Sequence, residues 1–293
     1  MNERPVRFGP GNGLIGVLTV PTEPVDGRPG VILLNAGLLY RVGPNRLYVE
    51  AARRLAGMGY PCLRFDMSGV GDSELQEGGL LYIERSTQDT VMAMDYLQAT
   101  VGTERFVLMG LCTGAFSAFR AALVDDRVSG CILLDGYAYP TVRSRLRHYL
   151  PRVLEFKRWT GYLGRRLGLA TSRGRGSDNP DDMIVFENEV VPRDRFGREL
   201  ATLLGRGTDL FMVYTGLGPL AFNYERQIHD AFPDLDLDRR ASIRYYANAD
   251  HTFTLPGNRL RLIADVADWL RITQPGSETA SSASGLPRER TGP

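Results

Sequence analysis

The sequence predicts an α/β fold in which a mostly parallel central sheet is flanked by helices and carries an inserted, mostly helical cap. Three observations favour this architecture. Short runs rich in Val, Ile and Leu recur at wide intervals, and several are apolar on both faces, as strands covered by helices on both sides are. Stretches with helical spacing separate these runs. The alternation breaks after Asp135, and the next clear strand begins only at Leu210.

The predicted elements follow one another along the chain. The strands are expected at 14–20, 31–34, 62–65, 106–109, 131–134, 210–214 and 243–246. Pro44 can occupy the first turn of a helix that continues to Leu55, and apolar residues at helical spacing predict further helices at 87–97 and 260–270.

The same pattern predicts how the chain is divided. Residues 1–136 and 206–273 should form the α/β core. A structureless loop of the length of 137–205 is unusual inside a compact domain, so this Arg-rich range is interpreted as the inserted cap. The last residues, 274–293, are rich in Ser, Gly, Pro and Thr, which is typical of a disordered tail.

Composition excludes several classes of protein. The 293 residues include 35 basic and 34 acidic side chains, so the net charge of +1 provides no overall attraction to nucleic acid. The three cysteines lack C-x-x-C spacing, so we expect free thiols in a reducing compartment, no metal and no other cofactor. The N-terminus lacks a secretory signal and no apolar run reaches the roughly 20 residues of a membrane span, which predicts a cytoplasmic protein.

A candidate nucleophile lies where the strand 106–109 runs into a helix that begins at Thr113. The junction reads Gly-Leu-Cys-Thr-Gly, with Cys112 at its centre. The two glycines let strand and helix approach closely, while the central residue adopts a strained backbone and projects above the sheet. The helix N-terminus favours a thiolate there. Cys62 and Cys131 each start an apolar strand and are predicted to be buried thiols.

One of the three histidines is the candidate base. His251 follows the strand 243–246, so it should lie at the carboxyl edge of the sheet, which is also the edge of Cys112. His148 falls in the predicted cap and His229 lies among polar neighbours, and both are expected at the surface. Cys112 and His251 together would provide a nucleophile and a general base.

At this point the chain resembles the α/β-hydrolase superfamily. The resemblance covers 14–271 without the cap, and it is strongest at the Cys112 junction, at the His251 loop and at 64–73, which reads R-F-D-M-S-G-V-G-D-S. The segment 35–48, N-A-G-L-L-Y-R-V-G-P-N-R-L-Y, is similar to hydrolases associated with exosortase systems. The cysteine nucleophile elbow resembles that of dienelactone hydrolases, polyester synthases and some acyl-CoA N-acyltransferases.

The resemblance implies the α/β-hydrolase fold, acyl-enzyme chemistry and an oxyanion hole of two backbone amides. One amide belongs to the residue after the nucleophile, here Thr113. The other comes from the loop that usually carries His-Gly, and here it is Gly37 or Leu38, depending on register. The loop reads Asn-Ala-Gly-Leu from Asn35, so the His of the family is absent, and backbone donors survive such a change.

The acid that orients the base is less clearly indicated. The family usually places an Asp after the strand 210–214, but this chain has none there. Asp135 ends the preceding strand at the catalytic edge and is favoured, with Glu225 as the alternative acid. A third option is that no acid is used. Asp250 adjoins His251 but should point away from it in an extended turn.

These features lead to three hypotheses. In the first, Cys112 attacks a small-molecule ester or thioester, free or carrier-bound, and water releases the acid. In the second, the acyl group passes from a CoA or carrier-protein thioester to an amine or hydroxyl. In the third, the protein is a non-catalytic binding protein on a hydrolase fold. The Arg-rich cap would be a solvated helix face or a surface for an anionic substrate, with an apolar side that covers the pocket.

Overall fold

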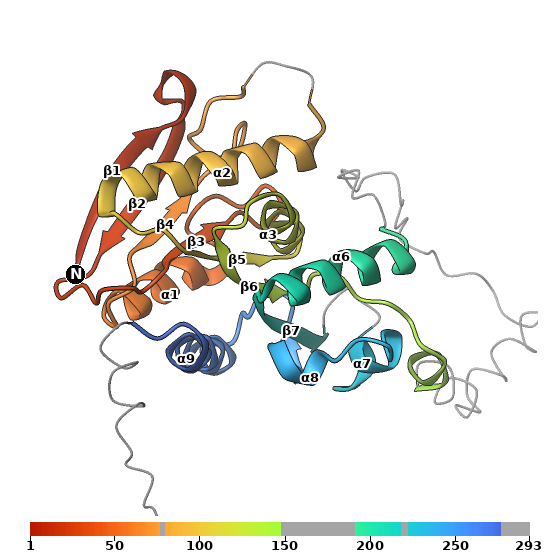
Figure 1. Ribbon diagram of the computed structural model, residues 1–293. Coiled ribbons are helices and arrows are strands. Elements are labelled where there is room, and N and C mark those ends of the chain that lie inside the picture. The colour runs from red at the N-terminus through yellow and green to blue at the C-terminus, as the bar shows by residue number, and fades with distance from the viewer. Residues whose placement is uncertain (77–79, 148–190, 218–221, 277–293) are drawn as a thin grey trace, which may run out of the picture.

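The computed structural model describes residues 1–76, 80–147, 191–217 and 222–276 (Figure 1). Its centre is an eight-stranded sheet in the order β1-β2-β4-β3-β5-β6-β7-β8. The β1–β2 and β2–β4 pairs are antiparallel, and the other five pairs are parallel. This arrangement confirms the predicted mostly parallel sheet.

The strands and helices alternate along most of the chain. The strands are β1 Asn2–Phe8, β2 Leu14–Val20, β3 Gly30–Leu34, β4 Cys62–Phe65, β5 Phe106–Leu111, β6 Val128–Leu134, β7 Asp209–Leu217 and β8 Ala241–Asp250. The helices are α1 Leu47–Ala56, α2 Tyr82–Val101, α3 Thr113–Val124, α6 Arg193–Arg206, α7 Gln227–Ala231, α8 Leu237–Arg240 and α9 Pro256–Thr273. Short 3₁₀ turns occupy Pro10–Asn12 and Pro44–Arg46.

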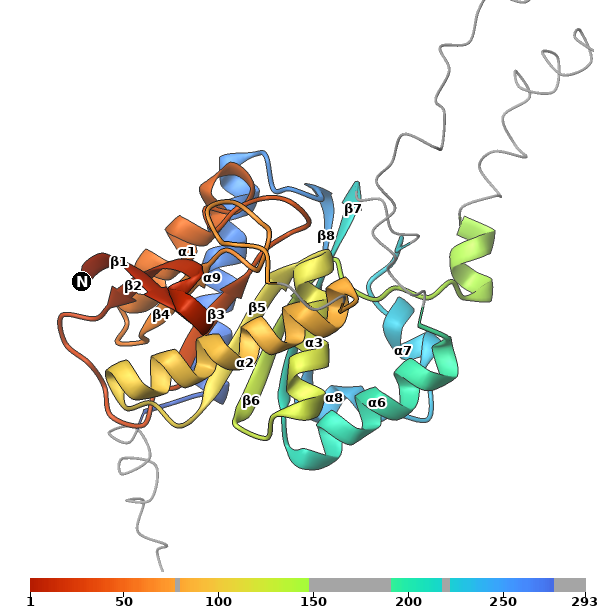
Figure 2. The ribbon, with the colours of Figure 1, turned by 90° about the horizontal axis from the view of Figure 1, so that it is seen from above.

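Helices cover both faces of the sheet (Figures 1 and 2). Buried side chains of α2, α3 and α6 form one core cluster with the strands, and those of α1 and α9 form the other. The middle strands therefore bury both of their faces. In β5, Phe106 and Leu108 belong to the first cluster, and Val107 and Met109 to the second. This two-sided burial is the physical reason for the uninterrupted apolar runs in the sequence.

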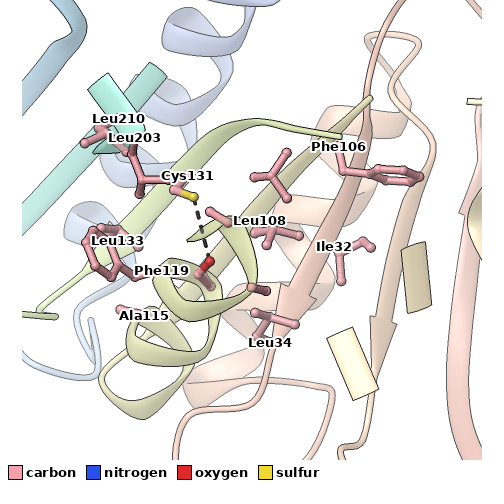
Figure 3. Close-up of a cluster of buried hydrophobic side chains, with 14 of the residues drawn as sticks. Ile32, Leu34, Phe106, Leu108, Ala115, Phe119, Cys131, Leu133, Leu203 and Leu210 are labelled. Carbon is pink, nitrogen blue, oxygen red and sulfur yellow. Dashed lines mark hydrogen bonds between the residues drawn. The ribbon is translucent and has the colours of Figure 1, made fainter. Parts of the chain in front are cut away.

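The first cluster also contains one of the predicted buried thiols. Figure 3 shows Cys131 among Leu133, Leu203 and Leu210, where its thiol contacts the Ala118 carbonyl at 3.9 Å. A thiol in such surroundings behaves as a small apolar side chain.

All seven predicted strands occur in the described residues, and β1 is an addition that the apolar pattern does not predict. Only Val6 and Phe8 of β1 are buried, because β1 lies at the edge of the sheet and pairs with β2 alone. Polar alternation is expected at such an edge. The predicted helices are present as α1, α2, α3 and α9. α2 and α9 are longer than predicted, whereas α1 begins only at Leu47, because Pro44 lies in the 3₁₀ turn before it.

The range 137–205, predicted as a cap, is described only at its two ends. Residues 148–190, and with them most of the Arg-rich stretch and His148, lie outside the described residues. At the C-terminal end, α6 places Phe196, Leu200 and Leu203 in the core cluster, so this helix covers the sheet beside α3.

The range 274–293, predicted as a tail, begins with a residue that is fixed to the core. The Gln274 side chain donates to the Ser129 carbonyl at 3.3 Å and to the Asp209 carboxylate at 3.1 Å. Residues 277–293 lie outside the described part of the chain.

Candidate active site

The nucleophile elbow has the backbone that the sequence predicts. Cys112 lies between β5 and α3 with φ 56° and ψ −116°, a conformation that is strained for a residue with a side chain. Its amide donates to the Leu134 carbonyl of β6 at 2.9 Å, and its carbonyl accepts from the amide of Ala115 in α3 at 3.0 Å. These hydrogen bonds on both sides of the residue stabilise its strained backbone conformation. The Cys112 side chain is partly exposed.

The two elbow glycines are required by close contacts. A Cβ on Gly110 would lie 2.2 Å from the carbonyl carbon and oxygen of Gly114. A Cβ on Gly114 would lie 2.5 Å from the Asn35 carbonyl oxygen. Real Cβ contacts are never that short, so the turn forms only when both positions are glycine.

His251 lies in a turn directly after β8, between Asp135 and Cys112. Its Nδ1 is 2.8 Å from Asp135 Oδ2. The Cys112 side chain is near enough to raise the His251 pKa, and because Nδ1 faces Asp135, the nitrogen available to the sulfur is Nε2. The structure thus brings three predicted residues together at the carboxyl edge of the sheet, from the ends of β5, β6 and β8.

Asp135 is buried and fully engaged by hydrogen bonds. Its side chain is 1% exposed, and it accepts the Thr215 amide at 2.7 Å and the Thr215 hydroxyl in addition to the imidazole. The Asp135 backbone has φ 44°, and its amide donates to the Val213 carbonyl at 2.8 Å. A buried carboxylate needs such partners, and here one of them is an imidazole.

The pKa of His251 is raised to about 9, first by the hydrogen bond with Asp135 and then by the interaction with the Cys112 side chain, while burial opposes the rise. The imidazole is therefore mostly protonated at neutral pH. An imidazolium that touches both a buried carboxylate and a thiol is suited to stabilising a thiolate and to giving its proton to a leaving group.

The other carboxylates named from the sequence lie elsewhere. Glu225 is exposed in the turn before α7. Asp250 accepts the Thr254 amide at 3.0 Å and the Thr252 hydroxyl at 2.8 Å, so it stabilises the turn that carries His251 and does not orient the imidazole. His229 Nε2 lies 3.0 Å from the Asp238 carboxylate between α7 and α8, outside the group around Cys112.

The predicted oxyanion donors lie next to the elbow. Thr113 is the first residue of α3, and the first amides of a helix have no acceptor within the helix. The Gly37 amide, however, donates to the Thr113 hydroxyl at 2.6 Å. Gly37 has φ 58° in a turn closed by the Leu39 amide and the Ala36 carbonyl, a conformation suited to glycine. Leu38 follows in this turn with a 60% exposed side chain.

Two further observations bear on the chemistry available. Cys62 and Cys131 are buried, and burial raises the pKa of both thiols, that of Cys131 to about 12. Within the described ranges, no three His, Cys, Asp or Glu side chains are placed to hold a metal ion, and none of the helices is long and apolar enough to cross a membrane.

Comparison with protein families and curated proteins gives two matches. Residues 31–189, more than half of the chain, match the family Hydrolase_4, described as serine aminopeptidase, S33. A stretch of 103 residues is 32% identical to the quorum-quenching protein AidA of Acinetobacter baumannii. That stretch is 33% of this chain and covers only 34% of the relative's length.

Solved structures resemble nearly the whole chain. A serine hydrolase without lid from Xanthomonas campestris matches with a TM-score of 0.57 at 16% identity, over 94% of this chain and 96% of the other. An esterase from Pyrococcus furiosus matches with a TM-score of 0.58 at 13% identity, over 93% and 91%. These likenesses confirm the α/β-hydrolase fold.

Proposed function

Because this chain belongs to the serine aminopeptidase S33 family of α/β hydrolases, we propose that it is a cysteine-dependent hydrolase of esters or thioesters that works through an acyl-enzyme on Cys112. His251 is the base and acid, and Asp135 orients it. The observation that carries the proposal is the grouping of Cys112, His251 and Asp135 at the carboxyl edge of the sheet, where His251 is hydrogen bonded to Asp135 and Cys112 contributes to its raised pKa.

The cysteine distinguishes this chain from the serine named in the family description. Two serines in the loop after β4 are poor substitutes, because their hydroxyls already hold that loop. Ser68 donates to the Asp89 carboxylate at 2.8 Å, and Ser73 donates to the Asp66 carbonyl at 2.6 Å. Cys112 instead has the strained backbone of an elbow and lies near enough to His251 to raise its pKa.

In the proposed reaction, the Cys112 thiolate attacks the acyl carbonyl and forms a tetrahedral oxyanion. The intermediate collapses as the C–O or C–S bond to the leaving group breaks, and His251 Nε2 gives its proton to that group. The neutral imidazole then takes a proton from water, which attacks the thioester carbonyl. When Cys112 leaves, the acid product is released, and His251 holds the proton again.

The oxyanion is stabilised by backbone amides, of which Thr113 supplies one. The Gly37 amide can contribute only after its bond to the Thr113 hydroxyl breaks. Among the described residues, none accepts a hydrogen bond from the Leu38 amide, and for this reason we favour it as the second donor.

The acyltransferase alternative uses the same acyl-enzyme with a different acceptor. A thioester of Cys112 reacts more readily with an amine than with water, so the acceptor has to be tested directly. The activity named for the curated relative, quorum quenching, enters the test as a further class of substrate.

The test is intact-mass measurement after brief incubation with acyl thioesters, activated esters and quorum signals, with and without amine acceptors. Wild type should show a Cys112 acyl adduct or released acid, and Cys112→Ala should show neither. Equal turnover by Cys112→Ala, or no turnover of any substrate by wild type, would reject the proposal. Amide product formed faster than acid would select the acyltransferase.

A further inference from the structure

The segment that leads into α1 touches both sides of the catalytic pair. Residues 43–48 contact the chain just before Cys112 and the chain just after His251. We propose that Tyr48 and Asn45 are positioning residues that set the relative placement of Cys112 and His251. This inference rests on the proposed function, because it assigns the two residues a role in the same reaction.

Tyr48 replaces a missing sheet partner at the elbow. The ladder between β3 and β5 ends at the Leu34–Gly110 pair, one residue before Leu111. Successive amides of a strand point to opposite neighbours, and the Cys112 amide points to β6, so the Leu111 amide faces the β3 side beyond the end of that ladder. There it donates to the Tyr48 hydroxyl at 3.0 Å.

The Tyr48 ring is held rigidly in that place. It is fully buried in the second core cluster. Gly43 has φ 70°, and a Cβ at this position would lie 2.6 Å from Tyr48 Cγ, so the glycine allows the segment to fold against the ring. The Tyr48 amide also donates to the Val42 carbonyl at 3.2 Å. The hydroxyl is therefore a fixed acceptor for the amide that precedes the nucleophile.

Asn45 makes the corresponding contact with the histidine turn. Its Nδ2 donates to the Thr252 carbonyl at 3.0 Å, directly after His251, and lies 3.5 Å from the Thr254 hydroxyl. Asn45 has φ 50°, a left-handed conformation that Asn tolerates better than most residues. Asp250 stabilises the turn from within, and Asn45 attaches it to the segment that carries Tyr48.

A second link joins α1 to the same turn. Glu50 of α1 accepts Arg259 Nε at 2.9 Å, and Arg259 Nη1 donates to the Phe253 carbonyl at 3.2 Å. The elbow and the histidine turn, which are far apart in sequence, are thus both attached to one short stretch of chain. Misplacement of a catalytic group by about 1 Å can lower a rate about 100-fold, so such attachments matter for catalysis.

The chain offers a matched control for each variant. Tyr48→Phe is matched by Tyr60→Phe, because Tyr60 is equally buried and its hydroxyl bonds the Gln274 carbonyl at 3.1 Å, away from the site. Asn45→Ala is matched by Asn258→Ala, because Asn258 Nδ2 bonds the Asn248 carbonyl at 3.1 Å. Both Asn variants lose a bond from a side-chain amide to a backbone carbonyl. Both Tyr variants lose one bond between a buried hydroxyl and the backbone, which the Tyr48 hydroxyl accepts and the Tyr60 hydroxyl donates.

The experiment measures kcat and KM for p-nitrophenyl butyrate, the rate of Cys112 alkylation by iodoacetamide, and Tm. We expect Tyr48→Phe and Asn45→Ala to lower kcat about tenfold with KM within about twofold, and to change the alkylation rate, while the controls leave both rates within about twofold. Asn45 is at the surface, so its variant serves the test even if Tyr48→Phe does not fold.

Two results would overturn the inference. One is a kcat and an alkylation rate within about twofold of wild type in Asn45→Ala. The other is an equal loss of kcat in the variants and in their controls, in proportion to the decrease in Tm, because such a loss would reflect reduced stability alone. Failure of the proposed function is recognised separately, as ester release that persists in Cys112→Ala, and the alkylation rate then still reports on the placement of Cys112.

Discussion

Replacing Asp135 by Asn tests whether this carboxylate orients and charges His251. The side chains have the same shape, but an Asn amide group facing the imidazole would oppose the Nδ1 proton and favour the other tautomer. Nε2 would then carry the proton and could no longer accept one from the thiol. Removal of the charge should also return the His251 pKa toward 6.5, because the bond to Asp135 is the largest cause of its rise to about 9.

The magnitude follows from that pKa. A rise from 6.5 to about 9 corresponds to about 3 kcal/mol of preferential stabilisation of the imidazolium. The side chains of His251 and Asp135 are 23% and 1% exposed, so solvent screens their interaction only weakly. Part of the rise in the His251 pKa comes from Cys112 and is not assigned to Asp135. Attributing about 2 kcal/mol to Asp135 predicts a loss of at least about 30-fold in the acylation rate, and the change of tautomer adds to it.

The assay is the burst of nitrophenolate from p-nitrophenyl butyrate, measured for Asp135→Asn and two controls. Glu225→Gln removes the alternative acid, which is exposed, and Asp89→Asn removes a buried carboxylate that bonds Ser68. Both controls should stay within about threefold of wild type. A burst rate of Asp135→Asn within threefold of wild type would refute the reasoning, as would a large loss in Glu225→Gln.

The same pair predicts how stability depends on pH. The folded-state pKa of His251 is raised, so the stabilisation from its charged form is fully present below pH 6.5 and is lost as the pH rises through about 9. The free energy of unfolding of wild type relative to Asp135→Asn should therefore decrease by about 2 kcal/mol between these limits, as measured by urea denaturation. A difference that stays constant from pH 6 to 10 would contradict the assigned coupling.

Two further predictions concern the thiols and the elbow. Brief treatment with iodoacetamide at pH 7.5 should label Cys112 and leave Cys62 and Cys131 unlabelled in the folded protein, because both are buried and burial raises their pKa; peptide mass spectrometry showing equal labelling would contradict this. Gly110→Ala should lower the free energy of unfolding by about 3 kcal/mol or prevent folding, because its Cβ would lie 2.2 Å from backbone atoms of the other elbow glycine. Gly205→Ala, where no atom lies within 4 Å of the added Cβ, should leave it unchanged or raise it, and equal denaturation curves for the two variants would argue against a crowded elbow.

The fold and the elbow could be predicted from the sequence because both depend on local signals. Residues of β5 are apolar on both faces since helices cover both sides, and the pattern shows this directly. The Gly-Leu-Cys-Thr-Gly junction needs two glycines because strand and helix touch there. β1 escaped prediction because an edge strand has few buried side chains. The range of α6 is interpreted from the sequence as part of a mostly helical cap, and its place in the core is not predicted because its apolar positions lie within an Arg-rich range.

The sequence by itself determined the α/β class and the candidate identities of Cys112 and His251. It left the acid open between Asp135 and Glu225, because residues at the ends of different strands come together only through the order of the sheet. Tertiary structure decided that Asp135 contacts the imidazole while Glu225 is exposed. It also decided that the Gly37 amide is already bonded and that the segment 43–48 links the elbow to the histidine turn, since such hydrogen bonds join residues far apart in the chain.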